Sequence, residues 1–350
     1  MKKTWTLVTG ASGFIGSAVV RRLVERGVPV KAFVRPGANL APFEGLPSDR
    51  FQLAFGDVTI ESTVYRALIS CNQLFHVASV FRYSSRNPDE IIKPAVLGTQ
   101  AVLAAARRQA VERVVVTSSA AVLGTSRDEP MDESHENRLM DPETYIRAKI
   151  EADRLVQEAA EGGMPIISVL PTGVFGPGDR KPTPNGKTLI DYLKLAPGRR
   201  IPATEGGISV VDVDDVAEGH VLAMEKGKLG ERYLLGGENV TFRGLFEILH
   251  ELTGLAEPGS APSPFLVELA GRALELGSRW SGKDPVLTYR LARDYAFARV
   301  WVSSAKAERE LGYTHRPARE TLARAIRWFL ANGYLPQPLA SRVRLELRPV

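Results

Sequence analysis

Tyr145 and Lys149 form the only Tyr-x-x-x-Lys of the chain. On an α-helix this spacing places both side chains on one face. A lysine ammonium beside a tyrosine stabilises the phenolate, which lowers the pKa of the tyrosine from about 10 toward the range where it can act as an acid or a base. Ser119 follows the apolar run Val114–Val116, and its hydroxyl could hold a substrate oxygen against Tyr145. The three residues predict proton transfer at a substrate oxygen. The plainer interpretation of the pair is two neighbours on a surface helix.

Three glycines with the spacing Gly-x-x-Gly-x-x-Gly follow the apolar run Trp5–Thr9. Gly10 would allow a sharp turn, Gly13 would let a pyrophosphate approach the backbone, and Gly16 would let a helix pack tightly on a sheet. The anion would bind the free N–H groups at the start of that helix. A strand before the glycines and a helix after them favour a dinucleotide site over a glycine-rich turn that only packs elements together.

Arg35 follows the second predicted strand. Dinucleotide folds that bind NAD usually place a carboxylate at this point for the ribose 2′-OH, whereas a guanidinium suits the 2′-phosphate of NADP. The sequence therefore predicts NADP (as NADPH) and makes NAD the less favoured cofactor. The competing interpretation is a solvated arginine after a turn.

The elements that would position these residues belong to one regular pattern. Apolar runs alternate with helical stretches, which is typical of a parallel sheet covered by helices on both faces. The predicted strands are Trp5–Thr9, Val28–Val34, Phe51–Phe55, Gln73–Val77, Arg113–Thr117 and Pro165–Leu170. The predicted helices are Phe14–Arg26, Glu61–Ile69, Pro88–Arg108 and Glu143–Glu161. This pattern predicts a doubly wound α/β fold, a Rossmann arrangement, whose ligands bind at the carboxyl ends of the strands.

The sequence changes in character after Pro171, where turn-forming Gly and Pro residues become frequent. We expect a dinucleotide-binding domain over residues 1–174 and a smaller, mostly helical, substrate-binding part over residues 175–350. Residues 207–235 are expected to return partly to the first domain, with a strand at Arg232–Leu235.

Composition excludes several classes of protein. The single cysteine, Cys71, rules out an internal disulfide framework and a multi-cysteine metal site, and it fits a reducing cytoplasm. The net charge of +5 is spread among acidic residues, so we expect no nucleic-acid binding. No apolar run reaches the roughly 18 residues of a membrane-spanning helix, and the one after Lys3 breaks at Gly10, too early for a secretory signal. We expect a cytoplasmic protein without a metal, acting on a small molecule and compatible with a homodimer.

Taken together, the motifs resemble the extended short-chain dehydrogenases/reductases of the NAD(P)-dependent epimerase/dehydratase type. The resemblance covers nearly the whole chain. It rests on Thr9–Gly16, Gly56–Val58, Phe75–Ser79, Thr117–Ser119, Tyr145 with Lys149, and Val213–Ala217, in this order.

The resemblance implies a catalytic trio of Ser119, Tyr145 and Lys149, with Lys149 also holding the nicotinamide ribose. Asp57 and Val58 would contact the adenine end of the cofactor, Val77–Ser79 its middle, and Pro171–Val174 the nicotinamide. The predicted cofactor-binding residues are Gly10, Ser12, Gly13, Phe14, Ile15, Gly16, Arg35, Asp57, Val58, Val77, Ala78, Ser79, Thr117, Tyr145, Lys149, Pro171 and Val174.

Two groups within this family compete for the chain. Residues Ile91–Thr99 are similar to the dihydroflavonol 4-reductase and cinnamoyl-CoA reductase group. Ala95 and Leu170 stand where many sugar epimerases carry Asn and Arg, which favours an apolar substrate. In contrast, Lys181–Pro184, Gly236–Asn239 and Ser303–Tyr313 are similar to the hopanoid-associated sugar epimerase group.

We therefore expect an NADP-dependent oxidoreductase that interconverts a carbonyl and a secondary alcohol on a bulky, largely apolar substrate. One alternative is a sugar-nucleotide epimerase that uses the same residues, with Arg180 or Arg199 clamping a pyrophosphate. Another is a non-catalytic NADP-binding sensor.

One apolar stripe in the C-terminal part is interpreted as structural before any functional role is considered. Residues Leu266, Leu269, Ala273, Leu276 and Trp280 form an apolar stripe at helical spacing. We expect core of the smaller part there. The alternatives are the wall of an apolar substrate site or a peripheral contact with a membrane surface.

Three polar residues are likewise expected to have structural roles. His76 is expected to be packed rather than to bind a metal, because no second histidine stands at ligand spacing. Asp214 and Asp215 resemble helix N-caps.

Overall fold

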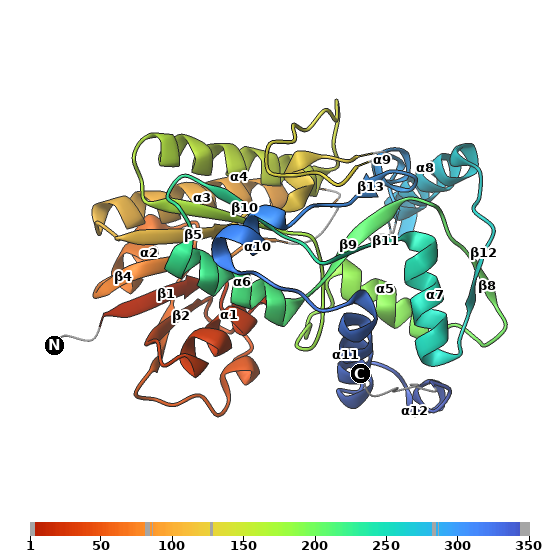
Figure 1. Cartoon of the computed structure of the whole chain (residues 1–350), viewed down its shortest axis with the longest axis horizontal. Helices are drawn as coiled ribbons and strands as arrows, with labels where there is room; N and C mark the ends of the chain where they lie inside the picture. The colour runs from red at the N-terminus through yellow and green to blue at the C-terminus, as the bar shows by residue number, and fades with distance from the viewer. Residues whose placement is uncertain are drawn as a thin grey trace.

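The computed structural model describes residues 4–80, 85, 87–126, 129–281, 285 and 287–343. In this part of the chain the main sheet has seven parallel strands in the order β10-β6-β5-β4-β1-β2-β3 (Figure 1). The strands are β1 (Trp5–Thr9), β2 (Val30–Val34), β3 (Phe51–Phe55), β4 (Cys71–His76), β5 (Arg113–Thr117), β6 (Ile166–Pro171) and β10 (Arg232–Leu235). The predicted fold class is confirmed, and strand ends differ from the prediction by two residues at most.

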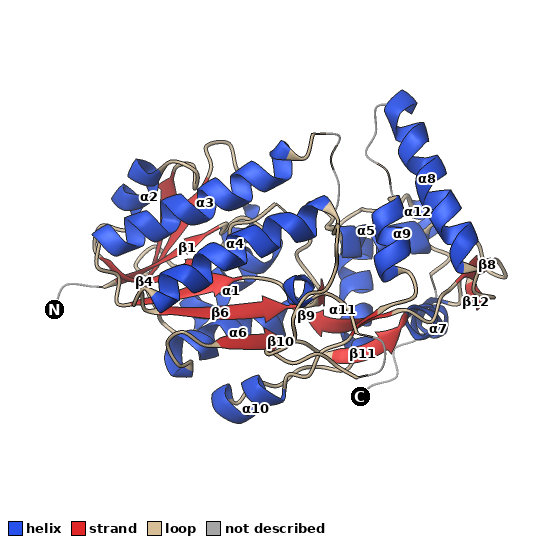
Figure 2. Ribbon diagram, turned by 90° about the horizontal axis from the view of Figure 1, so that it is seen from above, coloured by secondary structure: helices blue, strands red, loops and turns tan. Residues whose placement is uncertain are grey.

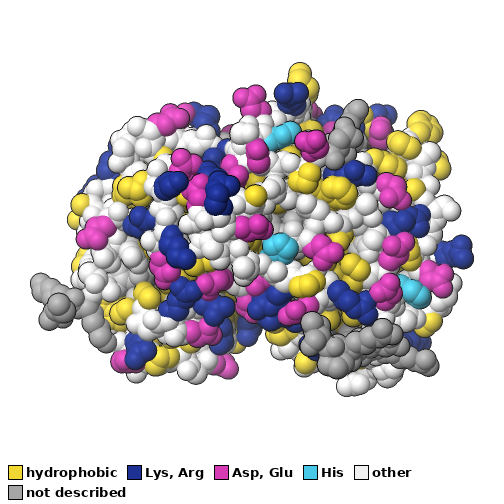
Figure 3. Space-filling model, in the orientation of Figure 1, with side chains coloured by type: hydrophobic (Ala, Val, Ile, Leu, Met, Phe, Trp, Pro, Cys, Tyr) yellow, Lys and Arg dark blue, Asp and Glu magenta, His cyan; other side chains and the backbone are white. Residues whose placement is uncertain are grey.

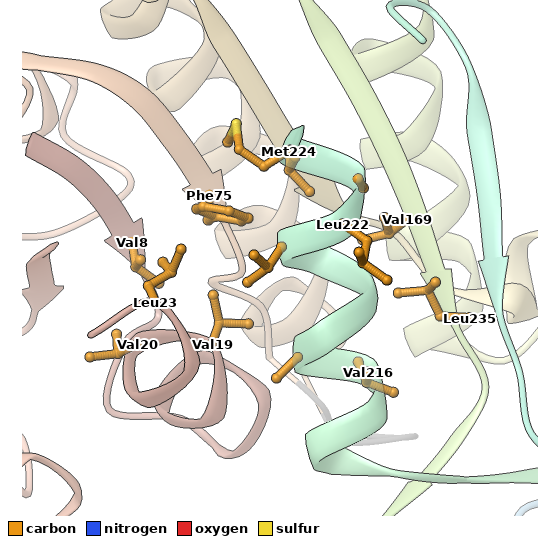
Figure 4. Close-up of a cluster of buried hydrophobic side chains, with 14 of the residues drawn as sticks. Val8, Val19, Val20, Leu23, Phe75, Val169, Val216, Leu222, Met224 and Leu235 are labelled. Atoms are coloured by element: carbon orange, nitrogen blue, oxygen red, sulfur yellow. The ribbon is translucent and has the colours of Figure 1, made fainter. Parts of the chain in front are cut away.

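Helices cover both faces of the main sheet, which explains why its central strands are almost entirely buried and apolar. One face carries α1 (Phe14–Glu25) and α6 (Val213–Lys226); the other carries α2 (Glu61–Ala67), α3 (Asp89–Arg108) and α4 (Thr144–Glu161) (Figures 1 and 2). Figure 4 shows the core under α1 and α6, where Leu23 and Met224 lie with Val8, Phe75 and Val169 of the strands.

A second, smaller sheet lies beside the main one and was not predicted. Its centre is β9 (Gly207–Asp212), which pairs with β7 (Gly173–Phe175), β11 (Glu238–Thr241) and β13 (Arg299–Val300). Of residues 207–235, α6 and β10 therefore lie on the main sheet, whereas β9 does not. The strands around β9 have two to four residues each and lie in turn-rich sequence, which leaves too little alternation to detect.

The other described helices belong to the C-terminal part, apart from two short 3-10 turns, η1 (Ala41–Phe43) and η2 (Ala120–Leu123). They are α5 (Pro184–Leu193), α7 (Phe242–Thr253), α8 (Pro264–Ser281), α9 (Tyr289–Tyr295), α10 (Ala305–Leu311), α11 (Ala318–Ala331) and α12 (Gln337–Ala340), with a pair of three-residue strands, β8 (Arg200–Pro202) and β12 (Glu257–Gly259). A second core unites α5, α7 and α11 against the small sheet. The stripe on α8 is not part of this core, contrary to expectation, because Phe265, Leu266, Leu269, Leu276 and Trp280 are more than half exposed. None of the described helices has the length and apolar character needed to cross a membrane.

The N-terminus of α6 corrects one prediction. Asp212, not Asp214 or Asp215, caps this helix and accepts a hydrogen bond from the Asp214 N–H (2.9 Å). The carboxylates of Asp214 and Asp215 instead form ion pairs with Arg324 and Arg316 respectively. The three acidic residues together hold α6 against the segment that contains α11, a long-range role that local spacing does not reveal.

Candidate active site

The carboxyl ends of β1 and β4 meet where the order of the strands reverses, which is where ligands bind in such sheets. Gly10 follows β1 with φ +65°, and a Cβ atom there would lie 2.6 Å from Cα of Ala78, which follows β4. A Cβ on Gly16 would lie 2.1 Å from the Gly10 carbonyl oxygen. Both positions therefore require glycine: Gly10 for the turn and Gly16 for the approach of α1 to the end of β1.

Gly13 is the residue before α1, and no side chain caps this helix. The first turn contains no acidic residue, and the Gly13 N–H donates to the Gly10 carbonyl (2.9 Å). The amide groups of Phe14, Ile15 and Gly16 precede the first internal hydrogen bonds of the helix, so they are oriented to bind an anion. A pyrophosphate fits this end of α1 in charge and in hydrogen bonding.

Asp57 and Arg35 lie near each other beyond the ends of β3 and β2. The Asp57 carboxylate accepts hydrogen bonds from the N–H (2.9 Å) and hydroxyl (2.8 Å) of Thr59. These bonds, helped by the charge of Arg35, lower the pKa of Asp57. Val58 packs near Gly98 of α3, while Arg35 is exposed at the edge of the site.

Lys149 is a buried cation at the ends of the central strands. Its Nζ donates to the carbonyl oxygens of Thr117 (3.2 Å) and Ser118 (3.5 Å), and only 7% of the residue is exposed. Burial lowers the pKa of Lys149 to about 8, although Asp153 acts in the opposite direction. The pKa therefore lies close enough to neutral for the protonation of Lys149 to change in the working range of an enzyme.

Tyr145 is the second residue of α4, one helical turn before Lys149, and is buried. Ser119 precedes η2, where its Oγ accepts a hydrogen bond from the Ala121 N–H (3.2 Å). Because α4 packs against η2, the fold brings all three residues of the predicted trio to the same end of the sheet.

His76 ends β4 beneath this site and is packed, as expected. Its Nδ1 and the hydroxyl of Thr9 share a hydrogen bond of 2.9 Å. Burial first, and then the charge of Lys149, lower the pKa of His76 to about 3. The ring stays neutral, so Lys149 is the cation there. Within the described residues there is no group of His, Cys, Asp and Glu side chains that could hold a metal ion.

The remaining predicted cofactor residues lie along the same edge with different exposure. Val77 and Ala78 are half-buried and Ser79 is exposed, directly after β4. Pro171 ends β6, and Val174 is buried in β7. Between them the buried hydroxyl of Thr172 has no hydrogen-bond partner in the described part of the chain. Ser12 lies half-buried in the glycine loop.

Thr117 is engaged inside the protein. Its hydroxyl bonds to Nε2 of His220 (2.7 Å), whose Nδ1 bonds to the Val216 carbonyl (2.7 Å). Since Nδ1 must donate to that carbonyl, Nε2 accepts from Thr117; burial lowers the pKa of His220 to about 4 and keeps the ring neutral. The Thr117 hydroxyl thus ties β5 to α6.

Leu170 belongs to the core and not to the wall of a substrate site, which corrects the prediction that its apolar side chain favours an apolar substrate. It is fully buried in a small core with Ala120, Val122 and Leu234, behind η2. Its apolar character therefore reports on packing and not on the substrate.

Sequence reasoning missed a buried polar network behind Lys149. Asp153 accepts a hydrogen bond from the Ser118 hydroxyl and forms an ion pair with Arg232 of β10 (3.2 Å). It is 5% exposed and stands four residues after Lys149 on α4. That spacing on a helix already assigned to the site was the signal that could have found it.

The family model for the NAD dependent epimerase/dehydratase family matches residues 6–236. The chain belongs to this family. The resemblance predicted from the motifs is confirmed. As a member of the family, the protein is an NAD(P)-dependent enzyme that acts on CH–OH groups.

Curated relatives in the family match over almost their whole length. A putative dihydroflavonol 4-reductase of Synechocystis is 32% identical, over 94% of this chain and 95% of the relative. Sterol demethylase protein B of Methylococcus capsulatus is 33% identical, over 94% and 99%. A 4-hydroxy-2-methyl-3-oxo-4-farnesyl-3,4-dihydroquinoline-1-oxide ketoreductase of Stigmatella aurantiaca is 33% identical, over 92% and 95%. Two of these three relatives are named as reductases.

Solved structures share the fold. The crystal structure of gox2253 has a TM-score of 0.82 at 36% identity and covers 95% of this chain and 100% of its own. PA4631, a nucleoside-diphosphate-sugar epimerase from Pseudomonas aeruginosa, has a TM-score of 0.73 at 23% identity and covers 95% and 99%. The second likeness shows the fold alone.

Proposed function

We propose that this member of the family reduces the carbonyl group of a bulky, largely apolar ketone to a secondary alcohol with NADPH. The observation that carries the proposal is the buried Lys149, held by two backbone carbonyls one helical turn from the buried Tyr145. Burying an ammonium is unfavourable, and buried lysines with a lowered pKa are typical of functional sites.

Each residue of the trio has a distinct role in this reaction. The hydroxyl of Tyr145 donates the proton that converts the carbonyl oxygen to a hydroxyl. The ammonium of Lys149, one helical turn away, would stabilise the negative charge that develops on Tyr145 as the proton leaves, and it would also bind the ribose. Ser119 donates a hydrogen bond to the same oxygen and polarises the carbonyl. NADPH supplies the hydride for the carbonyl carbon.

Residues along the carboxyl edge of the sheet would hold the cofactor. The amides at the start of α1 would bind the pyrophosphate, and Arg35 would bind the 2′-phosphate. The carboxylate of Asp57 accepts its hydrogen bonds from Thr59. It therefore leaves the guanidinium of Arg35 free to bind a phosphate. The exposed guanidinium of Arg35 supports NADP over NAD.

The relatives support an apolar substrate. Two of those with 33% identity carry names that refer to a sterol and to a farnesyl-bearing dihydroquinoline, and the Synechocystis relative is named after a flavonoid reductase.

A sugar-nucleotide epimerase remains the alternative, favoured by the likeness of Lys181–Pro184, Gly236–Asn239 and Ser303–Tyr313 to the hopanoid-associated sugar epimerase group. Its pyrophosphate clamp would have to include Arg180 or Arg199. Arg180 lies over the ring of Trp328 (5.9 Å to the centroid), and its carbonyl accepts from the Tyr334 hydroxyl, so it already has a packing role. A non-catalytic sensor does not need the buried Tyr145 and Lys149.

A panel of ketones and sugar nucleotides, with NADPH oxidation as the readout, tests the proposal. A reductase consumes NADPH in step with product, whereas an epimerase returns its cofactor unchanged. We expect NADPH consumption with an aromatic or terpenoid ketone. Epimerised sugar nucleotide without NADPH consumption would refute the proposal.

A further inference from the structure

Asp153 places a buried carboxylate on the face of α4 that carries Lys149, four residues further along the helix. Ser118 lies between the two charges. Its carbonyl oxygen accepts a hydrogen bond from Nζ of Lys149 (3.5 Å), and its hydroxyl donates to the carboxylate of Asp153. Only one residue separates the ammonium from the carboxylate, so their attraction acts over a short distance in a poorly solvated place.

Two further donors fix this carboxylate in place. Its Oδ2 accepts hydrogen bonds from Nε2 of Gln157 (2.5 Å) and from a guanidinium nitrogen of Arg232 (3.2 Å). Gln157 belongs to α4, whereas Arg232 belongs to β10, the outermost strand on this side of the main sheet. Two separate elements thus hold the carboxylate beside Lys149. Arg232, Asp153 and Lys149 form a row of alternating charges.

The groups around Lys149 leave Asp153 as the source of negative charge. His76 of β4 and His220 of α6 stay neutral, because burial lowers their pKa values to about 3 and about 4. Neither α3 nor η2, which pack against α4, buries a charged residue. Tyr145 is the titratable neighbour on α4 that Lys149 serves. In the described part of the chain, Asp153 is therefore the acidic residue that acts on Lys149.

The charges beyond Arg232 lie at the surface and pair with each other. Lys306 of α10 pairs with Glu231 (2.6 Å). Figure 3 shows acidic and basic side chains next to one another where Figure 1 places α10. Water and salt screen such surface charges, whereas the carboxylate of Asp153 is buried. The field at Lys149 therefore depends on the row and not on the surface outside it.

We propose that Asp153 is a positioning residue for the reaction: its carboxylate keeps Lys149 in the ammonium form, and Arg232 limits this effect. The inference rests on the proposed function, because it gives Asp153 a part in that reaction through Lys149. A carboxylate within about 4–6 Å of a cation shifts its pKa by about 1–3 units toward the charged form. Burial alone would therefore lower the pKa of Lys149 further than the value of about 8 that it has.

The pH profile of turnover tests the role of Asp153. Asp153→Asn removes the charge and leaves an amide oxygen that can accept from Ser118. The pKa of Lys149 should fall by about one unit, so the alkaline limb of kcat with NADPH and an aromatic ketone should move down by about one unit. Turnover should be about threefold below wild type at pH 7.5 and should recover at pH 6. Loss of the same size at every pH would show a merely structural role and overturn the proposal.

Arg232→Gln changes the other member of the ion pair and should have the opposite effect. Without this cation the whole charge of Asp153 acts on Lys149, so the alkaline limb should move to higher pH. An ion pair that only stabilises the fold would affect both variants in the same direction, and that result would refute the proposal. Because Asp153 is intact in this variant, the test does not depend on the folding of Asp153→Asn.

Glu151→Gln is the matched control. It removes one negative charge from α4 two residues after Lys149, a spacing that does not place the two side chains on one face. The pH profile of this variant should match that of wild type. A shift as large as that of Asp153→Asn would show that any charge on α4 has the effect, and would remove the specific role of Asp153.

Stability measurements separate this inference from the proposed function, because they need no turnover. In a Tyr145→Phe background, the urea stability of each protein is compared with that of its Lys149→Met partner between pH 6 and 9.5. The rise of this difference with pH should begin about one unit lower with Asp153→Asn than without it. An unchanged onset would overturn the role of Asp153 even in an active reductase. A shifted onset in a protein that reduces no ketone would refute the proposed function and leave the effect of Asp153 on Lys149 standing.

Discussion

Replacing Lys149 with Met should make the protein more stable while abolishing its activity. The buried ammonium has a pKa of about 8 instead of the ordinary 10.5. That difference corresponds to about 3 kcal/mol by which the folded state disfavours the charged form. Methionine carries no charge to desolvate, although it leaves the carbonyls of Thr117 and Ser118 without a donor, at a cost of about 1 kcal/mol each. At pH 7 the net gain should be about 1 kcal/mol.

The pH dependence isolates the contribution of the charge. Below pH 8 Lys149 is protonated in both the folded and unfolded states, so its full cost is present and stability does not change with pH on its account. Between pH 8 and 10.5 only the unfolded state holds the proton, and the stability of wild type therefore rises with pH. Relative to Lys149→Met, wild type should gain about 2 kcal/mol between pH 8 and 9.5.

Urea denaturation of the cofactor-free proteins at pH 7, 8, 9 and 9.5 measures this difference. Both proteins are compared in a Tyr145→Phe background, which removes the neighbouring tyrosine that would titrate in this range, and subtracting the variant from its parent at each pH then cancels the titration of distant groups. A difference that stays flat across this range would show that Lys149 is not a buried cation with a lowered pKa, and would remove the main support for its role.

Four other changes test neighbouring parts of the site. Tyr145→Phe keeps the ring but removes the acid, so turnover should fall by about 10²–10⁴ with cofactor affinity unchanged, and half-normal turnover would exclude Tyr145. Arg35→Ala should weaken NADP binding about tenfold or more and leave NAD binding unchanged in calorimetry; equal affinity of wild type for both would refute the assignment. Gly10→Ala should destabilise the fold by about 2 kcal/mol or more, because its Cβ would collide with Ala78. Gly13→Ala would place its Cβ 3.1 Å from the Gly10 carbonyl oxygen, so it should cost less stability than Gly10→Ala while weakening cofactor binding; cofactor binding like that of wild type would contradict the anion site.

The features that could be predicted from sequence are those that short stretches of chain determine. A parallel strand buried on both faces is a continuous apolar run, and Gly10 is required by a turn that involves its immediate neighbours. Tyr145 and Lys149 share a helix face by spacing alone. The main sheet and most of the catalytic edge follow from such local rules.

The features that could not be predicted depend on residues far apart in sequence. The cap of α6 is Asp212 because the helix begins at Val213, and Arg316 and Arg324, about 100 residues further along the chain, pair with all three aspartates. The apolar character of Leu170 was consistent with a pocket wall and with core, and only the packing around it distinguishes them. An aspartate can cap a helix or pair with an arginine, and a leucine can line a pocket or fill a core. Which of the two roles a given residue has depends on partners far away in the sequence, which spacing does not identify.

The catalytic helix α4 is where the two kinds of contact combine. Behind the site, Asp153 binds it to β5 through Ser118 and to β10 through Arg232, so the main sheet determines where Lys149 lies. At its start, Glu143 is held by Thr288, a residue of the C-terminal part 145 positions away. Tyr145 lies between these two attachments. The position of its hydroxyl therefore depends on both parts of the protein at once, and substitutions in α9 should alter turnover without contacting the substrate or the cofactor.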